Sequence, residues 1–222
     1  MTPVIGIDPT AGCKPAGFAV LDEEGALLEL KPLPMSSLVE RCAAWPGAPI
    51  GIDCPLSLPR GLHCLDPDHD CPDIATNGKK TAEAAILALG IGLYVTSKRS
   101  IIRGMIQACI ALKQRLERQG HEVFEVYPHA AKVLLFGRPV PSKASAGGLL
   151  WLRDRLTAVC GIAPLPDGLR HDELDAALVA HVVWRYKHGG ASAVGDPDEG
   201  TILIPVCGAN TDPRLTGHPR GV

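Results

Sequence analysis

The sequence predicts an α/β protein built on a mixed β-sheet with helices on both faces. Three short apolar segments follow one another near the N-terminus and are separated by turn residues, which is the pattern of a meander. From residue 38 onward, segments with helical periodicity alternate with further short apolar segments. A three-strand meander followed by such alternation is typical of a mixed sheet that helices cover on both sides.

Each expected strand is short, apolar and bounded by turn residues. The sequence DEEG at residues 22–25, with glycine last, joins the second strand to the third. Pro55 closes the fourth strand and Pro128 the fifth. A final apolar segment at residues 201–206 is compatible with a terminal edge strand. The five expected strands are residues 3–8, 17–21, 26–30, 50–53 and 122–127.

The expected helices carry apolar residues three or four positions apart. Ser36 or Ser37 can cap the first, and Ser100 can cap the third, which Gly120 ends. Between the fourth strand and the second helix, residues 57–80 are rich in Pro, Asp, Gly and Cys and predict a long loop. The expected helices are residues 38–45, 81–89, 100–119, 130–136, 148–160 and 172–188.

Length and composition indicate one soluble globular domain. The chain has 222 residues, of which 46% are hydrophobic and 21% charged. We expect a single domain over residues 1–207 and a flexible tail over residues 208–222. The formal net charge is −2, so a nucleic acid would have to bind at a local basic patch rather than at a broadly positive surface.

The sequence predicts a cytoplasmic protein that does not associate with membranes. No stretch reaches the ~18 uninterrupted apolar residues of a membrane span, and the N-terminus lacks the pattern of a signal peptide. The eight cysteines are scattered rather than arranged as a disulfide framework. Cys109 and Cys160 lie in apolar helical patterns, where a free cysteine behaves as a small hydrophobic residue.

Five acidic residues stand where expected strands end or a helix begins. Asp8 ends the segment VIGID and Asp53 ends PIGID, while Glu125 interrupts the fifth strand. Asp172 and Asp175 open the last helix three residues apart, about 60° around its axis, and so share a face. Carboxylates gathered in one pocket raise one another's pKa, and divalent cations relieve their repulsion. Oxygen-only ligands favour Mg²⁺ or Mn²⁺.

Each of these acidic residues also has a purely structural explanation. An aspartate after a strand often starts a turn, and both Asp8 and Asp53 stand one or two residues before a proline. Acidic residues are common in the first turn of a helix, where they complement the helix dipole. Glu125 is harder to explain in this way, because glutamate is disfavoured in strands and costly to bury without a partner. The argument for a site therefore depends on all five residues together.

In order along the chain, the segments VIGIDP, IGIDCPLSLP, FEVYPHA, HDELDAALVA and EGTILIPV resemble the domain-of-unknown-function family 429. The resemblance extends from about residue 3 to residue 206, and its most specific parts are the aspartates that end the strands and the HDxxDA helix start. That family is predicted to be a nuclease with the ribonuclease H-like fold. The resemblance therefore implies a mixed five-stranded sheet whose first three strands form a meander.

The resemblance also implies roles for the acidic residues. The fourth-strand acid, as in Holliday-junction resolvases, maps to Asp53, although glutamate is more common there; Glu40 is the alternative if an acid of the first helix is used instead. Glu125 matches the family's own fifth-strand motif. Asp8 would bridge two ions. The implied metal ligands are Asp8, Asp53, Asp172 and Asp175.

Basic and histidine residues near these motifs are candidates for substrate contacts. Residues 98–103 precede or open a helix, where backbone N–H groups also attract anions, although a solvated basic turn is the plainer explanation. His129 and His171 adjoin the acidic motifs and could move protons or serve the structure. The candidates for phosphate contacts are Lys79, Lys80, Lys98, Arg99 and Arg103.

Two metal-binding patterns in the long loop are weak. The residues His63, Cys64, His69 and Cys71 lack the paired spacing of structural zinc sites. A calcium loop beginning at Asp66 is rejected, because Cys71 and Asn77 occupy the positions that need glycine and glutamate.

The sequence therefore predicts a nuclease or phosphodiesterase that uses two Mg²⁺ or Mn²⁺ ions on DNA or RNA. A nucleic-acid binding module that uses the acidic residues structurally is the first alternative. A phosphotransferase or ATPase of the actin-like branch is the second, but it normally needs two such domains and Gly-rich phosphate loops that this chain does not clearly show.

Overall fold

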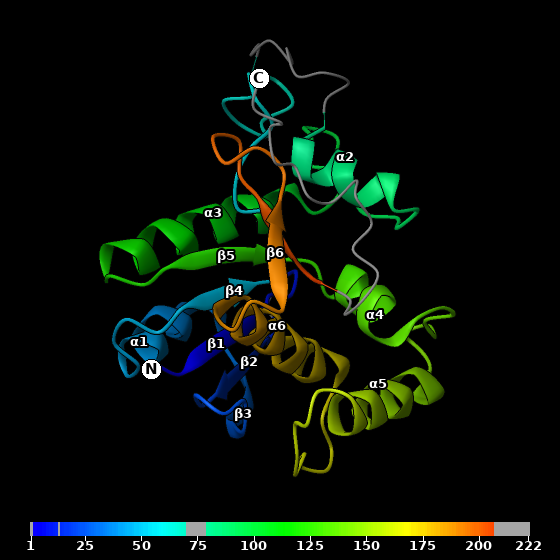
Figure 1. Cartoon of the computed structure of the whole chain (residues 1–222). Helices are drawn as coiled ribbons and strands as arrows, with labels where there is room; N and C mark the ends of the chain where they lie inside the picture. The colour runs from blue at the N-terminus through cyan, green and yellow to red at the C-terminus, as the bar shows by residue number, and fades with distance from the viewer. Residues whose placement is uncertain (1, 13, 70–78, 207–222) are drawn as a thin grey trace, which may run out of the picture.

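Seven strands form one sheet in the order β3-β2-β1-β4-β5-β7-β6 (Figure 1). The computed structural model describes residues 2–12, 14–69 and 79–206. The predicted tail at residues 208–222 lies outside the described residues. The strands are β1 (Val4–Asp8), β2 (Ala16–Leu21), β3 (Leu27–Leu33), β4 (Ile50–Ile52), β5 (Val123–Val126), β6 (Ala191–Val194) and β7 (Ile202–Pro205).

The first five strands have the arrangement that the sequence predicts, but the count of five is wrong. β1, β2 and β3 form an antiparallel meander, and β4 and β5 continue the sheet parallel to β1. β7 then pairs parallel with β5, and β6 pairs antiparallel with β7 at the edge. β6 escaped prediction because its sequence ASAV follows the helix after only three residues and has little apolar alternation.

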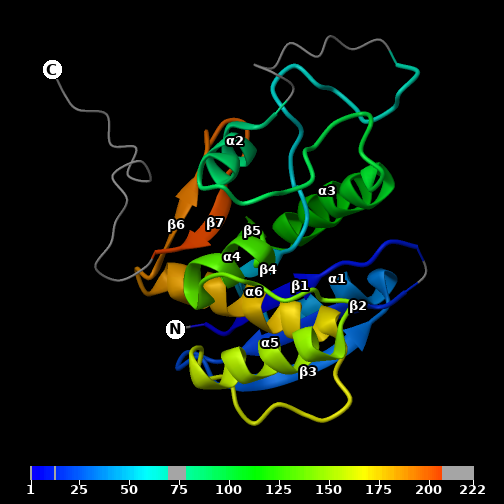
Figure 2. The same cartoon turned by 90° about the vertical axis from the view of Figure 1, so that its right-hand side faces the viewer.

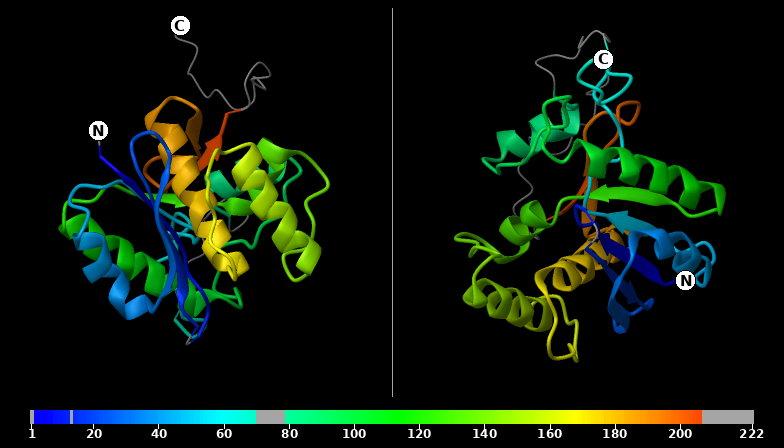
Figure 3. Two further views of the ribbon diagram at one scale, coloured as in Figure 1. Left: turned by 90° about the horizontal axis from the view of Figure 1, so that it is seen from below. Right: turned by 180° about the vertical axis from the view of Figure 1, so that it is seen from behind.

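Helices cover both faces of the sheet. One face is covered by η1 (Met35–Ser37), α1 (Leu38–Ala43) and α3 (Arg103–Arg118). The other face is covered by α4 (Pro128–Phe136), α5 (Ala146–Ala158) and α6 (His171–Lys187) (Figures 2 and 3). α2 (Thr81–Ala88) packs near β6 and β7 in a smaller apolar cluster. None of the helices that the structure describes combines the length and apolarity needed to cross a membrane.

The start of α3 differs from the prediction. Ser100 does not cap the helix, because residues 101 and 102 form a turn and Ile102 occupies the cap position without a side-chain hydrogen bond. The Oγ of Ser100 instead accepts a hydrogen bond from the backbone N–H of Ile102 at 3.4 Å. The basic residues that precede α3 therefore lie on an irregular segment rather than in its first turn.

Three glycines allow α6 to lie directly on the sheet. A Cβ atom placed at Gly6 would stand 2.0 Å from the carbonyl oxygen of Ala176, and one at Gly17 would stand 2.0 Å from that of Asp172. At Gly51 it would stand 2.6 Å from a methyl carbon of Val179. Because glycine has no Cβ, β1 and β2 approach the helix backbone closely and β4 approaches its valine side chains. The N-terminal turn of α6 is thereby held over Gly17, which pairs with Asp8 at the end of β1.

Candidate carboxylate site

Asp8 and Asp53 end two neighbouring parallel strands on the same face of the sheet. The register pairs Gly6 with Gly51 and Ile7 with Ile52, and the N–H of Asp53 donates to the carbonyl oxygen of Ile7 at 2.9 Å. Side chains two positions apart share a face, so Asp8 and Asp53 project on the side where Gly6 and Gly51 face α6. Because adjacent strands lie roughly 4.8 Å apart, the two carboxyl groups are neighbours.

Helix α6 adds Asp175 to this pair from above the sheet. Asp175 is 3% exposed, and its Oδ1 lies 2.6 Å from Nζ of Lys132 in α4. Its Oδ2 lies 3.1 Å from Nδ1 of His171, one helical turn earlier. Asp175 is therefore a carboxylate whose charge is already balanced by a buried lysine.

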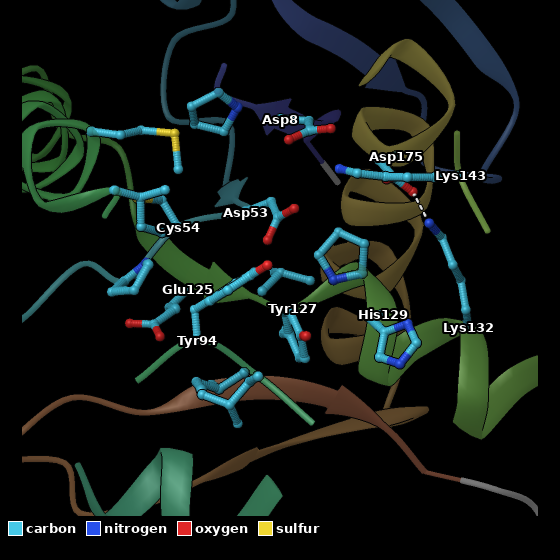
Figure 4. Close-up of a pocket in the computed structure, with 18 of the residues that line it drawn as sticks. Asp8, Asp53, Cys54, Tyr94, Glu125, Tyr127, His129, Lys132, Lys143 and Asp175 are labelled. Atoms are coloured by element: carbon cyan, nitrogen blue, oxygen red, sulfur yellow. Dashed lines mark ion pairs between the residues drawn. The ribbon is translucent and has the colours of Figure 1, made fainter. Parts of the chain in front are cut away.

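These residues line one end of a cavity of about 480 Å³. Figure 4 shows the carboxyl groups of Asp8 and Asp53 facing the cavity, with Lys143 reaching toward Asp175 from the segment that precedes α5. Lys132 and His129 line the same cavity from α4. We call Asp8, Asp53 and Asp175 the carboxylate site.

Asp8 and Asp53 are strained electrostatically where Asp175 is not. Burial, followed by repulsion from Asp53 and from the two aspartates of α6, raises the pKa of Asp8 to about 10. Burial and the charge of Asp175 raise the pKa of Asp53 to about 7. The Oδ2 atom of Asp8 is buried without a hydrogen-bond partner among the described residues. If Asp8 and Asp53 are both ionised, this edge of the site has more negative charge than its protein partners balance, so without a cation Asp8 holds its proton at neutral pH.

The pKa values of Asp175 and Lys143 shift in the direction that keeps both groups charged. Burial raises the pKa of Asp175, but Lys132 and His171 outweigh it and hold that pKa below its usual value. Burial lowers the pKa of Lys143, but the surrounding carboxylates, Asp175 first, outweigh it and raise that pKa. Lys143 is thus a charged ammonium group held near three aspartates by electrostatic attraction.

Two of the five predicted acidic residues lie apart from this group. Asp172 does not line the cavity; its carboxylate lies 3.8 Å from Nη1 of Arg170, although its charge contributes to the shift of Asp8. Glu125 lines the cavity but points away from α6, because it alternates with Phe124 and Val126, which pack on the α6 side. Its carboxylate accepts hydrogen bonds from the backbone N–H of Leu56 at 2.9 Å and from Nζ of Lys80 at 2.6 Å.

The five predicted basic residues do not form one patch. Lys80 is fully buried in its ion pair with Glu125, so its position does not fit the expected contact with a phosphate group. Lys98 contacts the carbonyl oxygen of His69, and Lys79 is partly buried. Arg99 is exposed on the segment that leads into α3, and Arg103, which is also exposed, is the first residue of that helix.

Sequence reasoning missed the cavity's two lysines and two tyrosines. Lys132 carried a usable signal, since a lysine in the otherwise apolar helix segment HAAKVLLF must find a buried partner. Lys143 carried no signal, because its segment has no periodicity. Tyr94 and Tyr127 line the cavity beside Asp53.

The oxygen ligands of the carboxylate site are of the kind that hard divalent cations prefer. It supplies carboxylate oxygens, one of them a buried atom without a partner, and such ligands suit Mg²⁺ or Mn²⁺. As they stand, however, no three His, Cys, Asp or Glu side chains of the described residues form a group that could hold an ion. The same finding covers His63, Cys64 and His69; Cys71 of that pattern, with Asn77, lies outside the described residues.

The solved structures that are similar to this chain include two of RuvC from Thermus thermophilus. The alignment with T. thermophilus RuvC covers 84% of this chain and 96% of RuvC, with 15% identity and a TM-score of 0.43. T. thermophilus RuvC in complex with a Holliday junction substrate has the same coverage, with 14% identity and a TM-score of 0.46. No curated protein matches the chain. The model of the family described as protein of unknown function (DUF429) matches residues 6–199, so the chain belongs to this family.

Proposed function

We propose that the protein is a nuclease or phosphodiesterase of ribonuclease H-like fold that uses Mg²⁺ or Mn²⁺ at the carboxylate site. The observation that carries this proposal is the pair formed by Asp8 and Asp53. Two adjacent carboxyl groups with raised pKa values, one buried with an unpartnered oxygen and the other half-buried, are destabilising when both are ionised unless a cation binds there. Natural proteins keep such arrangements where function needs them.

Asp8, Asp53 and Asp175 would hold the ions, and Asp172 would contribute charge from the rim. When bound, two divalent ions supply charge neutralisation at the phosphate and a water of lowered pKa. The sheet fixes Asp8 and Asp53 through the β1–β4 ladder, and Lys132 orients Asp175 at 2.6 Å. Lys143 is placed to approach a non-bridging phosphate oxygen, because its ammonium group is already drawn toward the three aspartates.

His171 and His129 are the candidates for moving a proton. Nδ1 of His171 lies 3.1 Å from Oδ2 of Asp175, so the ring helps to orient that carboxylate. His129 lines the cavity; burial, followed by the charges of Lys132 and Arg138, lowers its pKa, which favours the neutral ring. A neutral imidazole near a phosphodiester is able to accept a proton.

The test is cleavage of DNA, RNA and DNA–RNA hybrid oligonucleotides, and of bis(p-nitrophenyl) phosphate, in the presence of Mn²⁺ or Mg²⁺. We expect cleavage that chelation abolishes and that Asp8→Asn lowers more than about 100-fold, since even the partners of metal ligands are worth 10–100-fold. Asp154→Asn, on the exposed face of α5, is the matched control and should be active. Absence of cleavage in every substrate, or equal cleavage by Asp8→Asn, would contradict the proposal.

The alternative is a nucleic-acid binding module that keeps this fold without catalysis. The exposed Arg99 and Arg103 beside the cavity favour contact with nucleic acid under either function. Tight, salt-sensitive binding that does not depend on divalent ions, together with no cleavage, would identify the alternative.

A further inference from the structure

We propose that the apolar half of the cavity binds the base of an unpaired nucleotide, so that the substrate is single-stranded or locally unpaired nucleic acid. This inference rests on the proposed function and specifies its substrate class. It follows from the way in which the two ends of the cavity differ in chemistry. The charged end holds the carboxylate site and the ammonium groups of Lys132 and Lys143.

The other end of the cavity is apolar and aromatic. Flat and flexible side chains meet there. The two acidic residues that also line the cavity near them, Glu83 and Glu125, already accept hydrogen bonds from backbone N–H groups, and Glu125 is paired with Lys80. Such a surface suits the face of a ring rather than a phosphate group or a bare sugar. The apolar end is lined by Leu93, Tyr94, Ile102, Met105, Tyr127 and Ile202.

The two tyrosines have complementary properties. The hydroxyl of Tyr127 donates to the carbonyl oxygen of Gly92 at 2.7 Å, which fixes its ring as part of the wall. Tyr94 is 71% exposed and is close enough to raise the pKa of Tyr127, after burial and the charge of Asp53. Figure 4 shows both side chains on the side of Asp53 that faces away from Asp8. An exposed aromatic ring next to a charged site is the usual platform for stacking of a base.

Size and access exclude a stacked base pair from this end. The cavity of about 480 Å³ falls within the range of roughly 300–1,000 Å³ that small-molecule pockets occupy, which suits one nucleotide. A base within a duplex presents only its edges, so its face reaches Tyr94 only after unpairing and unstacking. Ile101, which is 84% exposed, and Arg103 flank the lining residue Ile102 and would meet the next part of the strand.

Binding of AMP and of ribose 5-phosphate to the full chain, measured by calorimetry with Mg²⁺, tests the base site without relying on activity. We expect AMP to bind at least about tenfold more tightly than the baseless compound, because stacking on an aromatic side chain contributes about 1–3 kcal/mol. Tyr94→Ala should remove most of that preference, whereas Tyr94→Phe should keep it. Leu150→Ala, an exposed position on α5, is the matched control.

Equal binding of the two compounds, binding of neither, or a Tyr94→Ala protein with the full preference would overturn the base site. In cleavage assays we expect a single-stranded oligonucleotide to react at least tenfold faster than the blunt duplex or an abasic strand of the same length. Tyr94→Ala should lower that ratio, whereas Leu150→Ala should leave it unchanged. The two proposals fail in different ways. If only the nuclease function is wrong, no substrate is cut but the preference for AMP over ribose 5-phosphate persists. If only the base site is wrong, bis(p-nitrophenyl) phosphate and duplex are still cut.

Discussion

The molecule contains two groups of buried carboxylates that differ in how their charges are satisfied. We call the first group the anchor network. It connects the loop after β4 with α2, β5 and the turn before β7, and it consists of Lys80, Glu83, Glu125 and Glu199. Glu83 accepts from the N–H groups of Lys80 and Thr96 at 3.1 and 2.8 Å, and Glu199 accepts from those of Arg60 and Thr81 at 2.8 and 2.7 Å. In the carboxylate site, Asp8 has a buried oxygen without a partner.

The difference separates structural acids from candidate functional acids. A buried carboxylate that accepts several hydrogen bonds and faces a lysine stabilises the segments it joins, provided that the pair stays intact. A buried pair of carboxylates with raised pKa values costs stability and is retained only when a ligand relieves it. Burial raises the pKa of Glu125 as well, but its carboxylate is fully partnered by Lys80 and the N–H of Leu56. By its partners Glu125 therefore belongs to the structure, although it lines the same cavity as Asp8.

The largest expected effect is loss of stability when the anchor network is broken. Lys80→Met leaves Glu125 buried without its cation, and removal of one partner of a buried pair costs about 3–5 kcal/mol. At about 2–4 °C per kcal/mol for a chain of this size, the melting temperature should fall by roughly 10 °C. Urea and thermal unfolding measure both quantities.

Lys113→Met is the control, since Lys113 forms only a surface pair with Glu117 at 3.7 Å and should change stability by less than about 1 kcal/mol. Glu125→Gln should lower activity only as far as it lowers the folded fraction. If Glu125→Gln instead abolished cleavage in a fully folded protein, the distinction between the two groups would be wrong.

Much of this could be predicted from the sequence, because apolar alternation and helical periodicity are local signals. The three-strand meander, both parallel strands after it and all six α-helices were predicted within a few residues of their observed ends. The aspartates that meet at the carboxylate site were recognised because each stands at the end of such an element. β6 and the start of α3 were missed because neither has a local pattern strong enough to show it.

What the sequence did not reveal was which partner each acidic residue would find. The pairing of Glu125 with Lys80 spans 45 positions and depends on the path of a loop without periodicity. The glycine signal was present but unused: VIGID and PIGID each have glycine two residues before the aspartate, on the same face. A helix that packs on those glycines must pass close to both aspartates, which identifies α6 as the source of the third.

The second expected effect concerns that approach of α6 to the sheet. Gly6→Ala would place a methyl group 2.0 Å from the carbonyl oxygen of Ala176, so the helix or β1 must shift. Overpacking of this kind costs about 1–3 kcal/mol, and the displaced Asp175 should weaken Mn²⁺ binding measured by calorimetry. Gly147→Ala, in α5 with open space around it, should instead stabilise the protein by about 0.5–1 kcal/mol. Unchanged Mn²⁺ affinity in Gly6→Ala would show that the helix does not set the site.

The third expected effect is a dependence of stability on pH. The folded-state pKa of Asp53, raised to about 7, means that the folded protein binds more protons than the unfolded chain between pH 4 and pH 7. Its contribution to the free energy of unfolding therefore falls as pH rises through that window, by at most about 1.4 kcal/mol per unit. Asp53→Asn should remove this loss, and saturating Mg²⁺ should reduce it in the unmodified protein. Parallel stability curves for Asp53→Asn and the unmodified protein without metal would show that Asp53 is not strained.

The smallest effect is expected at the exposed basic residues that flank the cavity. Arg99 and Arg103 contact solvent, so each can contribute one phosphate contact without any change to the fold. Arg103→Ala should raise the Kd for single-stranded DNA by less than about tenfold and lower the slope of log K against log salt by about 0.7. Fluorescence anisotropy over a range of salt concentrations measures both, with Arg118→Ala at the far end of α3 as the control. An unchanged salt slope in the Arg99→Ala, Arg103→Ala double variant would mean that the strand leaves the cavity by another side.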